Sequence, residues 1–163
     1  MIAALLLAIS SPSQSAGCLD HLEKTRGVKV TIRDRQEDRV GDGYLSCSFG
    51  LTASEVREDL KRIRSAATST GCGSLLYVSY SPLTVRFDDT KQRRLSRDQI
   101  CQNAPDIKRF LLRHMNQFEI AKLELHGWRG GFLANGDIIV NEQAILRGRS
   151  RLQLTFLGPL RNR

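Results

Sequence analysis

Alternation between apolar and polar residues predicts β-strands in several parts of the chain. Residues 28–33 and 45–49 repeat with a period of two, and we expect them to pair as an antiparallel hairpin with a long charged tip. Two more β-rich runs, 75–80 and 83–87, are predicted to be strands joined by a turn at Ser81-Pro82.

The last third of the chain also has strand patterns. Alternation at 121–126 and 152–156 predicts two strands. Between them, Asn135-Gly136 separates two short apolar runs, 132–133 and 138–140, and both turn residues tolerate the positive φ angles of a tight turn. We therefore expect a hairpin there.

Apolar residues spaced three or four positions apart predict two main helices. Thr52 and Glu55 form a capping box at the start of the first, which is expected to end at Gly71. The second is expected over 107–115, with Pro105 in its first turn. Shorter helices are predicted at 18–25 and directly after Ser96.

Together these patterns predict an α+β fold, with a mostly antiparallel sheet, about two main helices packed on one face, and stabilisation by disulfides. A chain of 163 residues is long enough for one domain with a substantial core. We place this single domain at residues 18–163.

The first 17 residues differ from the rest in carrying no charge. An apolar run at 2–9 precedes a polar stretch of small residues that contains Pro12. The run is too short to cross a bilayer, which takes about 20 apolar residues, but it matches the apolar region of a secretory signal peptide. We predict a signal peptide at 1–17, and hence an exported protein, periplasmic or secreted, with no transmembrane helix in the mature chain. The alternative is a buried N-terminal helix.

Residues 15–18 also resemble a degraded lipoprotein processing site, which would make Cys18 the carrier of a lipid anchor. Two features argue against this alternative. Ser15 stands where such sites carry an aliphatic residue, and lipidation would leave an odd number of cysteines.

The four cysteines predict two disulfide bonds in an exported domain, with three possible connectivities. Equal separations favour the sequential pairing of Cys18 with Cys47 and of Cys72 with Cys101. The cysteines lack the close spacing of a zinc site, so no metal site is predicted.

The formal net charge of +8 favours an anionic partner. Arginines are concentrated around a polar loop predicted at 88–95 and again near the C-terminus, where they occupy every second position and would share one face of an extended chain. Guanidinium groups bind phosphates and carboxylates through paired hydrogen bonds. The candidate partner-binding residues are therefore Arg93, Arg94, Arg97, Arg147, Arg149 and Arg151.

His126 is the one candidate for catalysis, because it ends a predicted strand beside a glycine-rich turn and could act as a general base. No motif positions a nucleophile next to it, and no phosphate loop or cofactor motif is present, so no cofactor is predicted. The acids of the charged loops alternate with basic residues, which is typical of solvated loops. They are Glu37, Asp38, Asp42, Asp88 and Asp89.

These features favour a non-catalytic binding or assembly module of the cell envelope, with a basic surface for an anionic envelope component or an acidic protein partner. The alternative is a small secreted hydrolase that uses His126 with a loop carboxylate. Aromatic residues make up only 6% of the chain, which argues against a stacking platform for nucleic acid.

Overall fold

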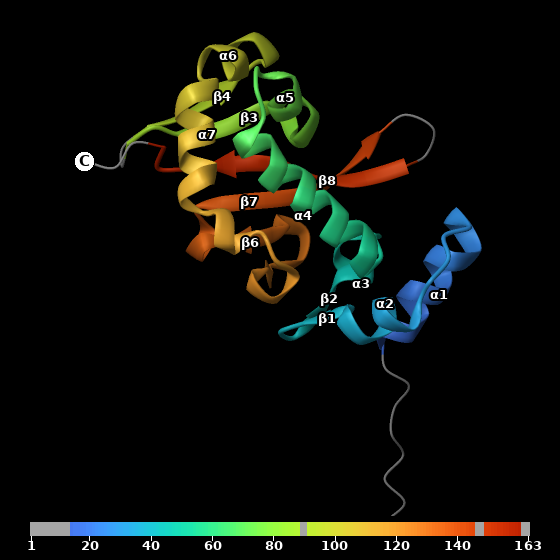
Figure 1. Cartoon of the computed structure of the whole chain (residues 1–163). Coiled ribbons are helices and arrows are strands. Elements are labelled where there is room, and N and C mark those ends of the chain that lie inside the picture. The colour runs from blue at the N-terminus through green and yellow to red at the C-terminus, as the bar shows by residue number, and fades with distance from the viewer. Residues whose placement is uncertain (1–13, 89–90, 146–148, 161–163) are drawn as a thin grey trace, which may run out of the picture.

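A mixed six-stranded sheet lies at the centre of the protein (Figure 1). The computed structural model describes residues 14–88, 91–145 and 149–160. The strand order is β4-β3-β8-β7-β6-β5, and neighbouring strands are antiparallel except for the parallel pair β3 and β8. The strands are β3 (Ser79–Arg86), β4 (Gln92–Leu95), β5 (Glu124–Leu125), β6 (Gly131–Leu133), β7 (Ile138–Ile145) and β8 (Arg149–Leu157). A separate hairpin is formed by β1 (Arg39–Val40) and β2 (Gly43–Tyr44).

Two main helices, α4 (Ala53–Thr68) and α7 (Ala104–Arg113), pack against each other on one face of this sheet (Figure 1). Three N-terminal helices gather at the start of α4, and two short helices lie beside β3 and β4. The predicted α+β fold with a mostly antiparallel sheet is therefore confirmed. The shorter helices are α1 (Gln14–Arg26), α2 (Ile32–Glu37), α3 (Leu45–Phe49), α5 (Gly73–Val78), α6 (Arg97–Gln102), η1 (Met115–Gln117), η2 (Ile120–Lys122), η3 (Gly127–Arg129) and η4 (Ala134–Gly136).

A buried carboxylate fixes α4 over the sheet. Asp59 points from the buried side of α4 and accepts hydrogen bonds from the backbone N–H of Leu152 in β8 (2.8 Å) and from Arg62 (2.7 Å). Burial raises the pKa of Asp59, and these two donors only partly offset that effect. The apolar stripe of α4, represented by Val56, Leu60 and Ile63, is fully buried beside it. Asp59 thus ties the helix to a central strand at one defined position.

The best-specified elements of the sequence form as predicted. Thr52 and Glu55 complete a capping box at the start of α4, and a second box opens α6 after Ser96. Pro105 lies in the first turn of α7. Asn135 and Gly136 take positive φ angles between β6 and β7, which pair as an antiparallel hairpin.

The predicted N-terminal hairpin is wrong. Two buried carboxylates, Asp34 and Asp38, stabilise helices where the two strands were predicted. Asp34 completes a capping box with Thr31, so α2 begins at Ile32 within the predicted strand at 28–33. Asp38 accepts hydrogen bonds from the N–H (2.8 Å) and hydroxyl (2.7 Å) of Ser46, in the first turn of α3. The predicted strand at 45–49 therefore forms a helix.

Four predictions further along the chain need correction. Residues 75–78 belong to α5, since Leu75 and Val78 are buried at helical spacing, while Ser79 and Tyr80 begin β3. The predicted turn at Ser81-Pro82 lies inside β3, in a stretch where the pairing with β8 is interrupted and the missing N–H of proline removes no ladder bond. Part of the predicted loop at 88–95 forms the edge strand β4. The predicted strand at 121–126 shortens to Glu124–Leu125, preceded by η2.

Both disulfides join the predicted pairs. Cys18 of α1 is bonded to Cys47 of α3, and Cys72, at the start of α5, to Cys101 of α6. The sulfur of Cys18 is then unavailable for a thioether to lipid, so the lipoprotein alternative is incompatible with this disulfide-bonded form.

The predicted signal peptide falls mainly on residues 1–13, which lie outside the described residues, and α1 begins at Gln14. Within the described part of the chain, no helix is both long and apolar enough to span a membrane.

Asp34→Asn is expected to lower the free energy of unfolding by about 1–3 kcal/mol at neutral pH, because Asp34 accepts hydrogen bonds from Thr31 and from the N–H of Ser54 in α4. Burial alone would raise the pKa of Asp34, but these hydrogen bonds outweigh it and lower the pKa below 3.8. The stabilisation is then fully present above the unfolded-state pKa and is lost as the pH falls through the lower folded-state pKa.

Urea denaturation at neutral pH and at about pH 2 measures this effect. The matched control is Asp42→Asn, an exposed carboxylate in the β1–β2 turn, which should change stability by less than about 0.5 kcal/mol. Equal losses for both variants, or a loss for Asp34→Asn that persists at low pH, would contradict the account.

Candidate functional site

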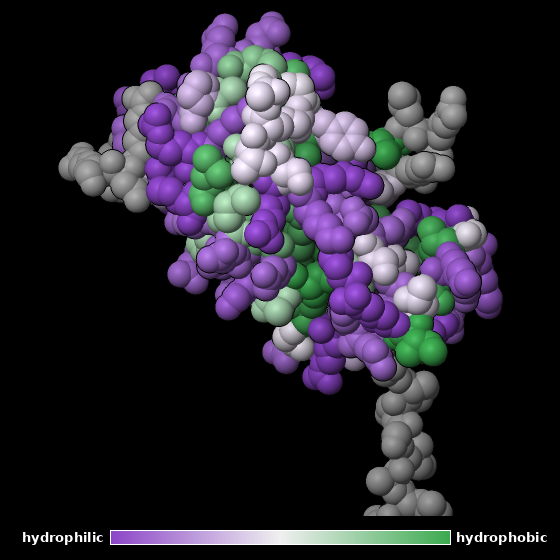
Figure 2. Space-filling model, viewed as in Figure 1, coloured by the Kyte–Doolittle hydropathy of each residue, from purple (hydrophilic) through white to green (hydrophobic). Residues whose placement is uncertain are grey.

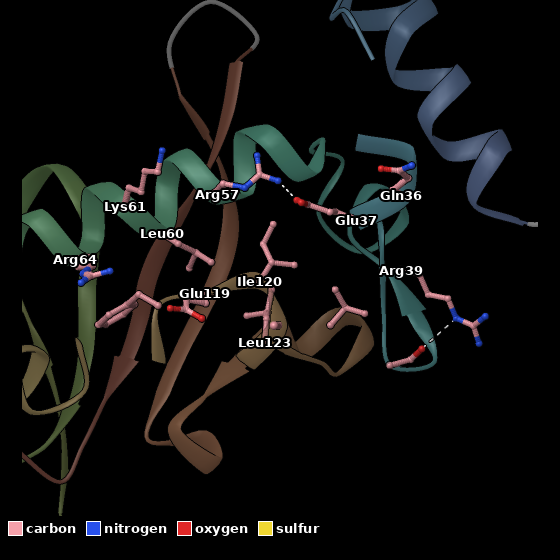
Figure 3. Close-up of a pocket in the computed structure, with 14 residues that line it drawn as sticks. Gln36, Glu37, Arg39, Arg57, Leu60, Lys61, Arg64, Glu119, Ile120 and Leu123 are labelled. Atoms are coloured by element: carbon pink, nitrogen blue, oxygen red, sulfur yellow. Dashed lines mark hydrogen bonds and ion pairs between the residues drawn. The ribbon is translucent and has the colours of Figure 1, made fainter. Parts of the chain in front are cut away.

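A cavity of about 830 Å³ lies between α4, the end of α2 with β1, and the segment that follows α7 (Figure 3). We call it the α4 cavity. Its volume is within the range of about 300–1,000 Å³ that is usual for small-molecule sites. It is lined by Gln36, Glu37, Arg39, Val40, Gly41, Arg57, Leu60, Lys61, Arg64, Phe118, Glu119, Ile120, Ala121 and Leu123.

The walls of the α4 cavity include an apolar floor made of Val40, Leu60, Phe118, Ile120 and Leu123. Leu60, Phe118 and Leu123 are buried and belong to the hydrophobic core, while Val40 and Ile120 pack against it and stay partly exposed. On the face shown in Figure 2, hydrophobic residues gather in a strip beside α4, with hydrophilic residues on both sides. The partly exposed Val40 and Ile120 therefore offer apolar surface that a ligand could cover.

A cationic stripe borders this floor. Arg57, Lys61 and Arg64 follow one another along α4 at intervals of four and three residues, which places them on one side of the helix. Arg39 stands on β1 at the end of the cavity near α2 (Figure 3). With Glu37 and Glu119 as the two carboxylates, the lining carries four cations and a net charge of +2.

These cations differ in their partners. Arg57 forms an ion pair with Glu37, which also pairs with Arg33 at 2.7 Å. Lys61 pairs with Glu58 at 3.2 Å, and both side chains are more than half exposed, so the pair is weak and easily exchanged.

Arg64 and Arg39 have no ion pair within the described part of the chain. Arg39 donates a hydrogen bond to the carbonyl of Gly41 (3.3 Å). Arg64 and Lys61 are thus the stripe cations most available to an anion.

A second cavity, of about 920 Å³, contains Arg151, which was predicted as a partner-binding residue. The guanidinium of Arg151 lies over the ring of Tyr77, 3.8 Å from its centroid. The charges that line this cavity are balanced, because three arginines face three carboxylates and two of the arginines are ion-paired with them. We therefore expect an anion to bind less strongly in this cavity than in the α4 cavity.

The predicted arginines do not form one surface. Arg94 pairs with Thr84 of β3, which pairs with Phe156 of β8. Arg151 precedes Phe156 by five residues in β8, a separation of roughly 16 Å at about 3.3 Å per residue. Arg149 begins β8, and Arg147 lies outside the described residues.

Arg93, Arg94 and Arg97 do lie close together, on β4 and at the start of α6, and we call them the edge arginines. All three are exposed and form no ion pair with any described residue. Arg93 lies over the ring of Phe87 at 5.8 Å. They place three cations at the edge of the sheet, with Arg93 and Arg94 on opposite faces of β4, separate from the α4 cavity.

His126 lies directly after β5 and does not line the α4 cavity. Its ring stacks on Phe132 with centroids 4.3 Å apart, and its Nε2 is 3.6 Å from a carboxylate oxygen of Glu124. The carboxylate that the structure brings to His126 therefore comes from its own strand rather than from a charged loop. Glu37 and Asp38 are engaged elsewhere, by arginines and by Ser46.

Among the described residues, no three His, Cys, Asp or Glu side chains come together as a possible metal site. Burial lowers the pKa of His114, which ends α7 with its ring against Phe110.

Comparison of the chain with protein-family models, with curated protein sequences and with solved structures found no match. Inference about function therefore rests on the geometry and chemistry of the sites themselves.

Sequence reasoning missed the α4 cavity. The spacing of Arg57, Lys61 and Arg64 beside the buried Leu60 was the one available signal, since it placed three cations along one helix. The opposite wall was hidden because residues 121–126 were expected to form a strand. The α2 end was hidden because residues 28–33 were also expected to form a strand, whereas α2 begins at Ile32.

His126→Ala is expected to lower the free energy of unfolding by about 0.5–1.5 kcal/mol through loss of the ring contact with Phe132. Urea denaturation measures this loss, with His21→Ala, an exposed histidine on α1, as the control. The hydrolase alternative instead predicts unchanged stability and lost turnover of an ester or amide substrate. That result would overturn a structural role for His126.

Proposed function

We propose that the protein is an exported, non-catalytic binding module of the cell envelope that captures an anionic component in the α4 cavity. The carrying observation is the cationic stripe beside the apolar floor, in which Lys61 and Arg64 are available to an anion. Guanidinium and ammonium groups next to a partly dehydrated surface bind anions more strongly than isolated surface charges do.

Export is supported by the two disulfide bonds, which persist in oxidising compartments and are rare in the cytosol. The apolar run at 2–9 is consistent with a signal peptide. A purely binding role is supported by the composition of the cavity. Its described lining contains no serine, cysteine or histidine, and Glu37 is held in ion pairs with Arg33 and Arg57.

A small anionic component suits the α4 cavity better than an acidic protein surface does, because the cavity is concave and its apolar floor is recessed beside α4. An acidic protein would instead match the exposed edge arginines, which lie at the rim of the sheet. The two partners predicted from the sequence therefore correspond to two different places on the molecule.

Paired charge reversals distinguish these places. Incubation with an envelope extract, followed by native mass spectrometry, should show that the unmodified protein retains an anionic component at low salt and releases it at high salt. Lys61→Glu with Arg64→Glu is expected to weaken this retention by about tenfold or more. Arg93→Glu with Arg94→Glu, which makes the same change of charge, should leave it intact.

If only the edge-arginine variant loses the anionic component, the component binds at the edge arginines, and the assignment to the α4 cavity is contradicted. Retention of a protein rather than a small component would favour the acidic-partner hypothesis. Retention that is insensitive to salt and to both reversals would refute the proposal.

A further inference from the structure

We infer that the ligand of the α4 cavity is a single-chain anionic amphiphile, whose alkyl chain covers the apolar floor and whose anionic head group binds Lys61 and Arg64. This inference rests on the proposed function and specifies its ligand class. It follows from three features of the cavity: the continuity of the floor, the position of the available cations, and the ion pair at one end.

The apolar floor is continuous from β1 to the segment after α7. Val40 contributes to it from β1. Figure 3 shows Leu60 on α4, with Ile120 and Leu123 on the opposite wall. A purely polar anion, such as inorganic phosphate, would leave this surface in contact with water. An alkyl chain would cover it, and each buried methylene strengthens binding by about fourfold.

The cations that lack strong partners determine where the head group binds. Arg57 is ion-paired with Glu37, a partner that it shares with Arg33, so it is less available to an incoming anion than Lys61 and Arg64 are. Lys61 and Arg64 are three residues apart on α4 and therefore adjacent. Among the described residues, only the exposed and exchangeable Glu58 competes for Lys61. A phosphate or carboxylate beside both would join charge and apolar surface in one ligand.

One chain fits the shape better than two. The ion pair between Arg57 of α4 and Glu37 of α2 spans the cavity toward its α2 end, as the dashed line in Figure 3 shows. This ion pair thus restricts the cavity at its α2 end. A second chain would have to displace this ion pair or stay in water.

The carboxylate of Glu119 is expected to weaken the binding of an anion in the α4 cavity. It lines the wall opposite α4, is exposed, and forms no ion pair with a described residue. An anion bound at Arg64 would experience its repulsion. Glu119→Gln should therefore strengthen binding of the amphiphile by about twofold to fivefold, within the range of a single exposed charge interaction.

Calorimetric titration of the disulfide-bonded protein with hexyl, octyl and decyl phosphate, each below its micelle concentration, tests the inference. Affinity should rise by about fourfold per methylene. Decyltrimethylammonium, with the same chain and the opposite charge, should bind at least about tenfold more weakly than decyl phosphate. Decanoate in place of decyl phosphate distinguishes a fatty-acid ligand from a phosphate ester.

Two variants distinguish the contribution of the alkyl chain to the binding affinity from that of the head group. Lys61→Gln with Arg64→Gln should lower every alkyl phosphate affinity while keeping the increase per methylene. Ile120→Asn should flatten that increase, whereas Leu112→Asn, an exposed apolar residue on α7 outside the cavity, should not. Circular dichroism and urea denaturation confirm that each variant is folded.

The outcomes distinguish this inference from the proposed function. Binding of inorganic phosphate and all three alkyl phosphates with equal affinity would overturn the amphiphile and leave anion capture standing. Failure of every anionic probe, together with loss of retention from the envelope extract, would overturn both. Tighter binding of a short two-chain anionic phospholipid than of decyl phosphate would contradict the single-chain ligand.

Discussion

The attachment of α4 to the sheet is the constraint on which the rest of the structure depends. One side of this helix buries Val56, Leu60 and Ile63, and Asp59 on that side accepts the N–H of Leu152 in β8. Because an α-helix turns every 3.6 residues, fixing this side also fixes the direction of the cationic stripe. The helix therefore organises the core and presents Lys61 and Arg64 beside the apolar floor.

The N-terminal helices provide the second wall of the α4 cavity through buried polar contacts rather than a large core. Asp34 joins α2 to the start of α4, Asp38 joins α2 to α3, and a disulfide joins α3 to α1. These short-range links place Glu37 opposite Arg57. In this small N-terminal unit, hydrogen bonds to carboxylates and a disulfide bond provide much of the stabilisation that apolar burial provides around α4.

The sequence predicted the elements that carry strong local signals, such as the capping boxes at Thr52 and Ser96 and the turn at Asn135-Gly136. In the N-terminal segment it failed because buried polar contacts decided the structure. Residues 28–33 alternate like a strand, yet Thr31 and Asp34 cap a helix there, and residues 45–49 satisfy helical spacing as well as alternation. The candidate site escaped prediction because its walls come from segments far apart in the chain, whereas the predicted arginines were chosen by their closeness in sequence.

The most direct test of the central claim is a map of where an anionic amphiphile binds. Backbone amide NMR shifts of the isotopically labelled protein can be followed during titration with decyl phosphate. We expect the largest changes in α4 around residues 57–64 and in the opposite wall at 118–123. Changes concentrated at the edge arginines, or spread evenly over the surface, would contradict the central claim.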